Sequence, residues 1–230
     1  MALNTATFKT RTLSAILFAG IMLAGILWNK WSFFLLFSVI HAGCWIEYQK
    51  LIEIIHPAYR RISALHRYAF IAAGWIMMWI FVVEQVSPSP NLQLYLITLI
   101  AVLLLFALVA DVWQSTFRWP VYFYSVAGLI YISLSWSLMI DLRFKGILRF
   151  GEQQVDLGWV VPLVLITAIW INDTMAYIVG SLIGKTPFSS ISPNKTWEGT
   201  AGGALLAVVV VTGCWYAFVT PASWKEIACI

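Results

Sequence analysis

Seven apolar stretches dominate this sequence and constrain its fold more than any other feature. They lie near residues 12–28, 31–47, 67–84, 92–110, 120–140, 158–184 and 200–220. A bilayer core about 30 Å thick needs roughly 20 apolar residues per helix. A composition that is 61% hydrophobic over 230 residues exceeds what a water-soluble core of this size hides. The sequence therefore predicts an all-α, polytopic transmembrane helical bundle of about seven spans, forming a single integral-membrane domain over residues 1–230.

Charged residues are sparse, at 10% of the chain, and the net charge of +4 gives no support for a nucleic-acid partner. The basic residues beside the first two spans are Lys9, Arg11, Lys50, Arg60, Arg61 and Arg67. The positive-inside rule then predicts a multi-pass protein of the cell membrane with a cytoplasmic N-terminus. Alternation of spans also makes segment 185–199 cytoplasmic. It places a loop with Arg143, Lys145 and Arg149 outside, against the rule.

Asp173 lies well inside the sixth apolar stretch. A carboxylate at the centre of a span costs about 2.5–3.5 kcal/mol on insertion scales, so it indicates a functional site. At helical spacing its face carries mostly small residues, on which a helix, an ion or a ligand can approach: Ala176, Tyr177, Gly180 and Gly184. The alternative is that Asp173 hydrogen-bonds within the bundle, for example to Asn172 or Thr174, and only fixes helix packing.

The segment GSLIGKT, Gly180–Thr186, is similar to a phosphate-binding P-loop but does not fit its spacing. The pattern G-x-x-x-x-G-K-[ST] requires a glycine where Val179 stands. We therefore expect Gly180 and Gly184 to make a small-xxx-small helix contact. Lys185 and Thr186 would lie near an anionic ligand at the helix end.

A polar connector, TPFSSISPNKTWEGTAGG, follows from Thr186 to Gly203. Ser192 or Asn194 is predicted to cap the next helix, whose N-terminus is itself an anion site. Ser192, Lys195 and Thr196 would add donors for phosphate oxygens, while Glu198 would orient Lys195 or hold a cation. Three glycines would let this helix start pack tightly: Gly199, Gly202 and Gly203. The alternative is an ordinary capped cytosolic loop.

Taken together, residues 172–203 resemble the phosphatidate cytidylyltransferase family, also called CDP-diacylglycerol synthases. In that family an intramembrane Asn-Asp...Ala-Tyr...Gly...Gly-Lys segment precedes Ser-Pro-x-Lys-Thr-Trp-Glu/Gln-Gly and then Gly-Gly. The family's further signature, Pro-Gly-His-Gly-Gly with neighbouring acidic residues, does not occur in this sequence. The resemblance therefore implies that the chain is a truncated or fragmentary relative, carrying part of the family's site.

The resemblance implies transfer of CMP from CTP to phosphatidate, which gives CDP-diacylglycerol and pyrophosphate with the help of Mg²⁺. It implies catalytic roles for Asp173, Lys195 and Glu198, with Asp173 also a metal ligand. Substrate binding would fall to Ser192, Thr196, Lys185, Asn172 and Tyr177. The expected partners are CTP, phosphatidate and membrane lipid, and a homo-oligomer is left open.

Two alternatives stand beside this interpretation. One is a CTP-dependent polyprenol or phytol kinase, and the other is a lipid-binding or transport protein without catalysis. No chemistry is assigned to His41, His56 or His66, because no carboxylate or cysteine lies at ligand spacing from them. His56 and His66 are interpreted as loop residues.

Overall fold

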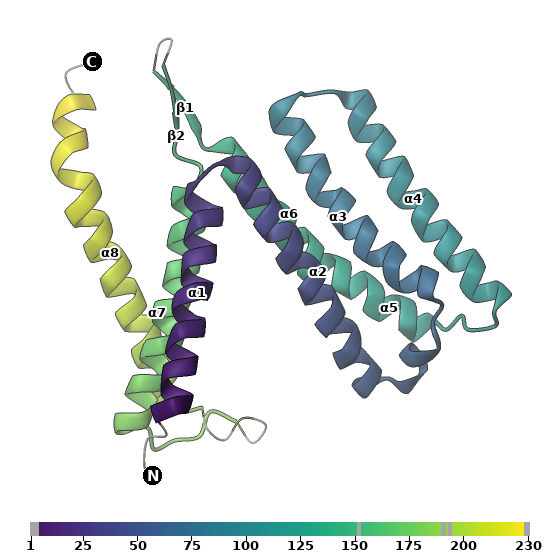
Figure 1. Ribbon diagram of the computed structural model, residues 1–230, viewed down its shortest axis with the longest axis horizontal. Coiled ribbons are helices and arrows are strands. Elements are labelled where there is room, and N and C mark those ends of the chain that lie inside the picture. Colours follow the sequence, from purple (N-terminus) through teal and green to yellow (C-terminus); the bar gives the residue numbers. More distant parts are fainter. Residues whose placement is uncertain (1–4, 151–152, 190–191, 193–194, 228–230) are drawn as a thin grey trace. The chain divides into compact units, whose positions relative to one another are not determined.

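The computed structural model describes residues 5–150, 153–189, 192 and 195–227 (Figure 1). The helices are α1 (Thr5–Leu27), α2 (Lys30–Ile55), the 3₁₀ segment η1 (Pro57–Arg61), α3 (Ala64–Val86), α4 (Pro90–Trp113), α5 (Trp119–Gly128), the π-helical segment η2 (Leu129–Leu134), α6 (Ser135–Lys145), α7 (Val160–Ile183) and α8 (Trp197–Ile227). The strands are β1 (Ile147–Phe150) and β2 (Gln153–Asp156). The chain forms two compact units, Met1–Trp159 and Val160–Ile230, and each is described by itself. The prediction of one domain over residues 1–230 stays a prediction.

Six helical segments among the described residues are long and apolar enough to cross a membrane. They are α2, α3, α4, the helical run 119–145, α7 and residues 197–214 of α8. Within α1 a shorter apolar stretch, Ala15–Leu27, precedes them. These segments follow the predicted stretches in order along the chain, so the prediction of a helical, multi-pass membrane protein with about seven spans is confirmed. The short antiparallel hairpin β1–β2 was not predicted.

Polar residues at the turns of the first unit explain where its helices begin. The Asn29 side chain accepts hydrogen bonds from the backbone N–H of Trp31 and Ser32, and the Ser32 hydroxyl accepts one from the Asn29 N–H. This reciprocal cap satisfies N–H groups that the first turn leaves unpaired. Ser89 likewise caps α4, with Pro90 as its first residue. Local side-chain caps therefore fix the starts of both α2 and α4.

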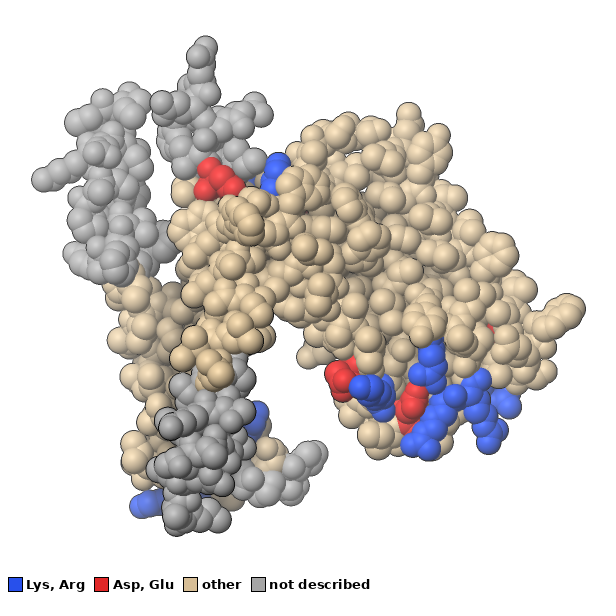
Figure 2. Space-filling model, viewed as in Figure 1, with Lys and Arg blue, Asp and Glu red and all other residues tan. Residues whose placement is uncertain are grey.

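The first unit packs aromatic and aliphatic side chains inside and presents more of them outside. One buried cluster centres on Trp45, Phe70 and Ile132, and another joins Ile52, Tyr59, Ile62 and Val121. Many large apolar side chains remain exposed. Figure 2 shows that charged side chains on the face in view gather in a few places, with a basic cluster over the end of α2 and η1. An apolar exterior with charge confined to helix ends fits a protein surrounded by lipid.

The end of α6 corrects the predicted basic loop after the fifth stretch. Arg143 and Lys145 lie in α6, not in a loop, and the side chain of Arg143 is only 2% exposed. The Arg143 guanidinium donates to the Asp156 carboxylate at 2.7 Å, and the Lys145 ammonium lies 2.7 Å from the Asp141 carboxylate. Both cations therefore serve the packing of α6 and the hairpin. The side chain of Arg149 lies outside the described residues.

Asp156 is the electrostatic partner that this hairpin supplies. Partial burial raises the pKa of its carboxyl, but hydrogen bonds from the Arg143 guanidinium and the Gly158 N–H outweigh that effect, so the pKa lies below its usual range. The ionised form is thus the one that the fold stabilises.

Candidate functional site

The site in the second unit begins with the close contact between α7 and α8. A Cβ added to Gly203 would lie 2.6 Å from the backbone oxygen of Asn172, and one added to Gly199 would lie 2.7 Å from that of Ala176. Gly180 on α7 in turn approaches Thr196 and Gly199. Small residues let the two backbones meet without side chains between them. The predicted packing roles of these glycines are confirmed.

The connector between α7 and α8 folds back on itself through backbone hydrogen bonds. The Phe188 N–H donates to the Lys195 oxygen at 2.7 Å, and the Trp197 N–H donates to the Thr186 oxygen at 3.0 Å. The rings of Phe188 and Trp197 pack with centroids 4.6 Å apart. These bonds hold the two ends of the connector, residues 186–188 and 195–197, side by side in antiparallel directions. Lys195 is consequently fixed beside the start of α8.

Thr196 caps α8, which corrects the predicted cap. Its hydroxyl accepts a hydrogen bond from the Gly199 N–H at 3.1 Å, the bond that an N-cap side chain makes. Because α8 begins at Trp197, Ser192 lies too early in the chain to do this. Asn194 lies outside the described residues. The tight approach of Thr196 to Gly180 and Gly184 leaves the cap lodged against the end of α7.

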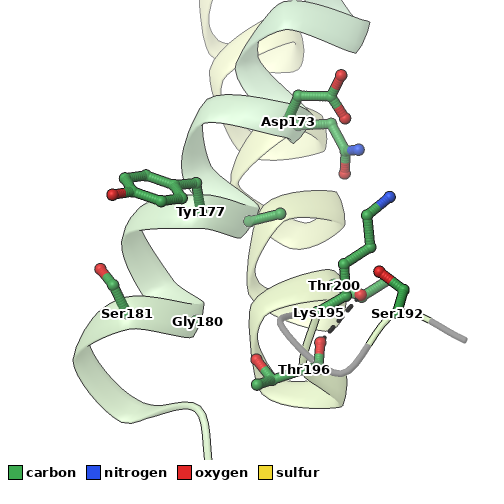
Figure 3. Close-up of a pocket in the computed structure, with 10 residues that line it drawn as sticks. Asp173, Tyr177, Gly180, Ser181, Ser192, Lys195, Thr196 and Thr200 are labelled. Atoms are coloured by element: carbon green, nitrogen blue, oxygen red, sulfur yellow. Dashed lines mark hydrogen bonds between the residues drawn. The ribbon is translucent and has the colours of Figure 1, made fainter. Parts of the chain in front are cut away.

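A cavity of about 600 Å³ opens between α7, the connector and the start of α8. Its walls are Asn172, Asp173, Ala176, Tyr177, Gly180, Ser181, Ser192, Lys195, Thr196 and Thr200. In Figure 3 the side chain of Lys195 extends from the connector toward the turn of α7 that carries Asp173, while Tyr177 and Ser181 point to the other side of α7. Six of the eight residues predicted for the site therefore line one cavity.

The two charged residues that line this cavity, Asp173 and Lys195, are not paired with other residues that the structure describes. Within the described part of the chain, Asp173 and Lys195 make no side-chain hydrogen bond and no ion pair, with each other or with any other residue. The hydrogen bond from Asp173 to Asn172 or Thr174 that would give it a packing role is not present there. A carboxylate and an ammonium thus face the same space with their bonding capacity unused. Both side chains are exposed, so their charges are accessible to a ligand.

Glu198 and Lys185, the other two predicted residues, lie beside the cavity and do not line it. The Glu198 carboxylate accepts hydrogen bonds from the N–H groups of Lys185 and Thr186, and from the Thr186 hydroxyl. Among the described contacts, Glu198 holds the end of α7 against the first turn of α8. Lys185 takes part through its backbone.

Few side chains of the cavity could coordinate the predicted Mg²⁺. No three His, Cys, Asp or Glu side chains in the described residues are grouped to hold a metal ion. Asp173 is the carboxylate that lines the cavity. Mg²⁺ is commonly held by one or two carboxylates together with substrate phosphates and water. The residues present therefore fit a metal that arrives with a nucleotide.

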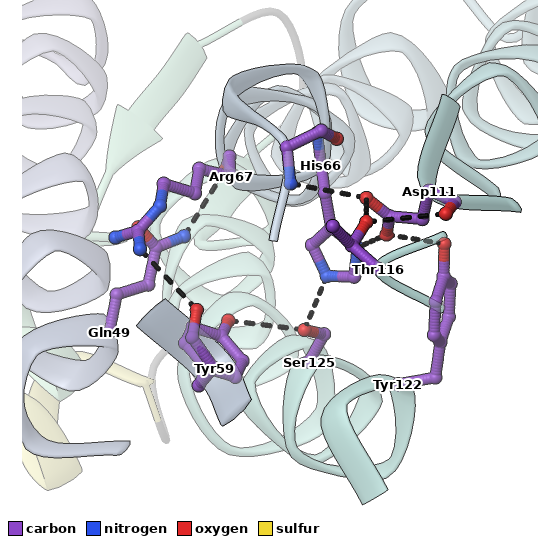
Figure 4. A network of polar contacts seen from close by, with 9 residues as sticks. Gln49, Tyr59, His66, Arg67, Asp111, Thr116, Tyr122 and Ser125 are labelled. Carbon is purple, nitrogen blue, oxygen red and sulfur yellow. Dashed lines mark hydrogen bonds and ion pairs between the residues drawn. The ribbon is translucent and has the colours of Figure 1, made fainter. Parts of the chain in front are cut away.

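A second polar cluster, in the first unit, was missed by the sequence analysis (Figure 4). The His66 Nδ1 atom lies 2.6 Å from Asp111 Oδ2, and its Nε2 atom lies 2.7 Å from the Ser125 hydroxyl. The Tyr122 hydroxyl donates to Asp111 at 2.9 Å, and the Ser63 N–H donates to it at 3.1 Å. His66 is thus a buried residue of α3, and its interpretation as a loop residue is wrong.

The order serine, imidazole, carboxylate in this cluster is that of a hydrolase triad, but its setting is not. His66, Asp111 and Ser125 are all fully buried, and the Ser125 hydroxyl is also 3.1 Å from the Tyr59 hydroxyl. No substrate reaches such a serine in this conformation. The cluster therefore ties α3, α4 and α5 together. Its signal in the sequence was the carboxylate at the end of the fourth apolar stretch, one residue beyond its predicted limit.

Comparison with known proteins matches residues 9–230 to the model of a family described as "Cytidylyltransferase family". The chain is 32% identical over 143 residues to the phosphatidate cytidylyltransferase of Bacillus subtilis, covering 60% of this chain and 49% of that protein. It is 30% identical over 150 residues to human phosphatidate cytidylyltransferase 2, covering 65% and 25%. A 44-residue match to the Aquifex aeolicus enzyme of that name is 57% identical, covering 19% and 17%.

The aligned regions span about half or less of these relatives' own lengths. No solved structure matches the chain. The family match, however, extends over nearly the whole sequence and includes both α7 and α8, whose connector forms the cavity. The chain belongs to the cytidylyltransferase family.

Proposed function

We propose that this chain binds CTP and phosphatidate at the α7–α8 cavity and takes part in the transfer of CMP to the lipid, which yields CDP-diacylglycerol and pyrophosphate. The observation that carries the proposal is that Lys195 and Asp173 line one cavity without using their charges on each other. The names of the relatives, phosphatidate cytidylyltransferases from bacteria and mammals, supply the substrates.

Lys195 is the cation of the cavity and would neutralise phosphate oxygens of the nucleotide. Ser192 lines the same cavity and would donate its hydroxyl to those oxygens, whereas the Thr200 hydroxyl already donates to the Thr196 backbone oxygen. Asn172 offers an amide next to Asp173. Glu198, bound to Thr186, would keep the connector in the shape that presents Lys195. Tyr177 is 78% exposed and would contact lipid or the nucleotide base with its ring.

The reaction needs little covalent chemistry from the protein. An oxygen of the lipid phosphate attacks the α-phosphorus of CTP, a new P–O bond forms, and the bond to the β-phosphate oxygen breaks, with its electron pair leaving on pyrophosphate. Catalysis of such a step rests on positioning and charge neutralisation. A divalent ion such as Mg²⁺, bound by Asp173 and the nucleotide phosphates, would supply further positive charge.

The protein would act in the cell membrane with its N-terminus and residues 185–199 on the cytoplasmic side. The support is the excess of lysine and arginine near the first two spans, together with alternation through the helices. Arg143 and Lys145, which had opposed this orientation, are engaged in ion pairs at the end of α6. A cytoplasmic connector would meet CTP from the cytosol.

The test is an assay of the purified chain in detergent with radiolabelled CTP and phosphatidate. We expect CTP-dependent formation of CDP-diacylglycerol, and a loss of roughly 10²-fold or more in kcat/KM for Lys195→Ala. Lys50→Ala, at an exposed residue of the first unit, is the matched control and should leave turnover unchanged. Normal turnover by Lys195→Ala would remove this residue from the mechanism. Binding of CTP without turnover would limit the chain to a substrate-binding role.

A further inference from the structure

One end of the first unit gathers two short loops. Helix α2 ends at Ile55 and α3 begins at Ala64, so the first loop contains η1. Helix α4, which packs along α3, ends at Trp113, and α5 begins at Trp119. The two loops are joined by the buried cluster around Asp111, which contacts Ser63 from the first loop and Thr116 from the second. They therefore lie at the same end of the unit.

Three arginines on these loops have no carboxylate partner among the described residues. Arg60 and Arg61 end η1 and are exposed, and Arg118 precedes α5 and is exposed as well. The Arg118 guanidinium donates only to the neighbouring backbone oxygen of Phe117 within that part of the chain. Their basic neighbours differ, because Lys50 pairs with Glu47 and Arg67 pairs with Glu53. Uncompensated positive charge is thus left on Arg60, Arg61 and Arg118, which we call the arginine face.

Cations at the other end of the unit are already engaged. Arg143 and Lys145 form ion pairs with Asp156 and Asp141, and the Lys30 ammonium lies 5.5 Å from the centre of the Phe144 ring. The contrast between the two ends holds for the described side chains. In Figure 2 the basic side chains over the end of α2 and η1 form the largest blue group in view.

Hydrogen bonds to Asp111 and from Arg67 hold the backbones of the two loops that carry the arginine face. Asp111 accepts the Ser63 N–H on one side, and its backbone oxygen accepts the N–H groups of Thr116 and Phe117 on the other. Arg67 also donates weakly to the backbone oxygens of Tyr59 and Arg60. Because the backbones are fixed, little backbone conformational entropy is lost when the arginines bind a ligand.

Two exposed tryptophans indicate where the arginine face lies relative to the surface of the bilayer. Trp113, at the end of α4, is 87% exposed, and Trp119, next to Arg118, is 77% exposed. Exposed indole rings at helix ends settle at the level of the lipid headgroups. Guanidinium groups at that level meet phosphates, which they bind with two parallel hydrogen bonds.

We propose that Arg60, Arg61 and Arg118 form a binding surface for the headgroups of anionic phospholipids, separate from the α7–α8 cavity. The ligand is a lipid phosphodiester in the bilayer leaflet next to the two loops. Binding there tethers anionic lipid to the first unit and does not require turnover. The proposal is therefore independent of the nucleotide chemistry.

Native mass spectrometry of the full chain in neutral detergent tests this surface. The probes are equimolar dioleoyl phosphatidylglycerol, an anionic lipid, and dioleoyl phosphatidylcholine, a neutral one. We expect preferential retention of phosphatidylglycerol by the parent chain. In the variant R60Q/R61Q/R118Q the preference should fall at low salt by about fivefold per arginine removed. Equal retention of the anionic lipid by parent and variant would overturn the proposal.

The matched control removes three positive charges that have partners in the protein, in the variant K30Q/K50Q/K145Q. It should keep the preference, and an equal loss would show that net charge alone acts, contrary to a defined surface. A second variant, R60K/R61K/R118K, keeps charge at the same positions and should retain at least half of the preference. Loss equal to that of the glutamine variant would count against the proposal.

Discussion

The Glu198 carboxylate bonds Thr186 twice, accepting its backbone N–H at 3.2 Å and its hydroxyl at 2.8 Å. These contacts join the first turn of α8 to the residues that follow α7. Between the two lies the connector that carries Ser192 and Lys195 into the cavity. Glu198 is therefore placed to control the shape of the site without lining it.

Replacing Glu198 by alanine should loosen this connector. Two N–H groups and a hydroxyl lose their acceptor, and CTP should bind roughly fivefold more weakly. Glu198→Gln keeps one oxygen acceptor, so its affinity for CTP should lie between those of the parent and Glu198→Ala. Amide hydrogen exchange of residues 185–189 and 195–198, beside CTP titration, measures both effects. Unchanged exchange with weakened CTP binding would instead indicate direct contact between Glu198 and the ligand.

Gly203 should be intolerant of any side chain. A Cβ there would lie 2.6 Å from the Asn172 oxygen and 2.8 Å from the Ala176 Cβ, so α7 and α8 would have to separate. Gly203→Ala should lower the melting temperature of the chain in detergent, since overpacking commonly costs about 1–3 kcal/mol. It should also disturb the cavity that these helices share.

Gly213 on the same helix provides the control for Gly203. Nothing described lies within 4 Å of a Cβ added at Gly213. Gly213→Ala should therefore leave the melting temperature unchanged or raise it, because alanine favours a helix over glycine by about 1 kcal/mol. Equal destabilisation by both substitutions would mean that α8 responds to lost glycine rather than to the α7 contact.

Asp173 should govern the metal dependence of nucleotide binding. If its carboxylate holds Mg²⁺ together with CTP, Asp173→Asn should abolish the gain in CTP affinity that Mg²⁺ provides while leaving metal-free binding unchanged. Calorimetric titration with and without Mg²⁺ measures this difference. Thr174→Ala, at the next residue and outside the cavity walls, is the control. A Mg²⁺ effect that survives in Asp173→Asn would contradict the role.

Asp156 should make the end of α6 sensitive to acid. Its pKa in the folded protein lies below the unfolded value of about 3.9. The stabilisation is therefore present above the unfolded pKa and is lost as pH falls through the folded pKa, when Arg143 is left buried without its partner. Melting temperatures between neutral pH and about pH 3 should fall more steeply for the parent than for Asp156→Asn. Parallel curves would exclude this linkage.

The sequence predicted the helices well, because apolar length alone specifies a membrane span. The starts of two of these helices also have a local cause, because Asn29 and Ser89 cap the helices that follow them. Three cavity residues were predicted: Asp173 from the free-energy cost of a carboxylate inside a span, and Lys195 and Ser192 as donors for phosphate oxygens in the polar connector. The cap of α8 was misplaced, because several hydroxyl residues precede the helix and only their geometry distinguishes Thr196.

Long-range pairing was beyond the reach of sequence patterns. His66 and Asp111 are 45 positions apart, and the partners of Asp111 come from three further segments. Arg143 was likewise predicted as a loop residue, and its pairing with Asp156 depends on the hairpin that follows α6. Spacing along one helix predicts a shared face, but contacts between helices require the packed structure.

His66 should stabilise the first unit through its hydrogen bond to the buried Asp111 carboxylate. His66→Ala removes one of the four described residues that bond the buried Asp111 carboxylate. Loss of a buried hydrogen-bond partner costs about 1–3 kcal/mol, so the melting temperature of the chain in detergent should fall. Thr98→Ala, at an exposed residue of α4, is the control and should have little effect. A fluorophosphonate probe should leave Ser125 unmodified in the folded chain, because its hydroxyl is fully buried. Modification of Ser125, or an unchanged melting temperature for His66→Ala, would contradict a structural role for this cluster.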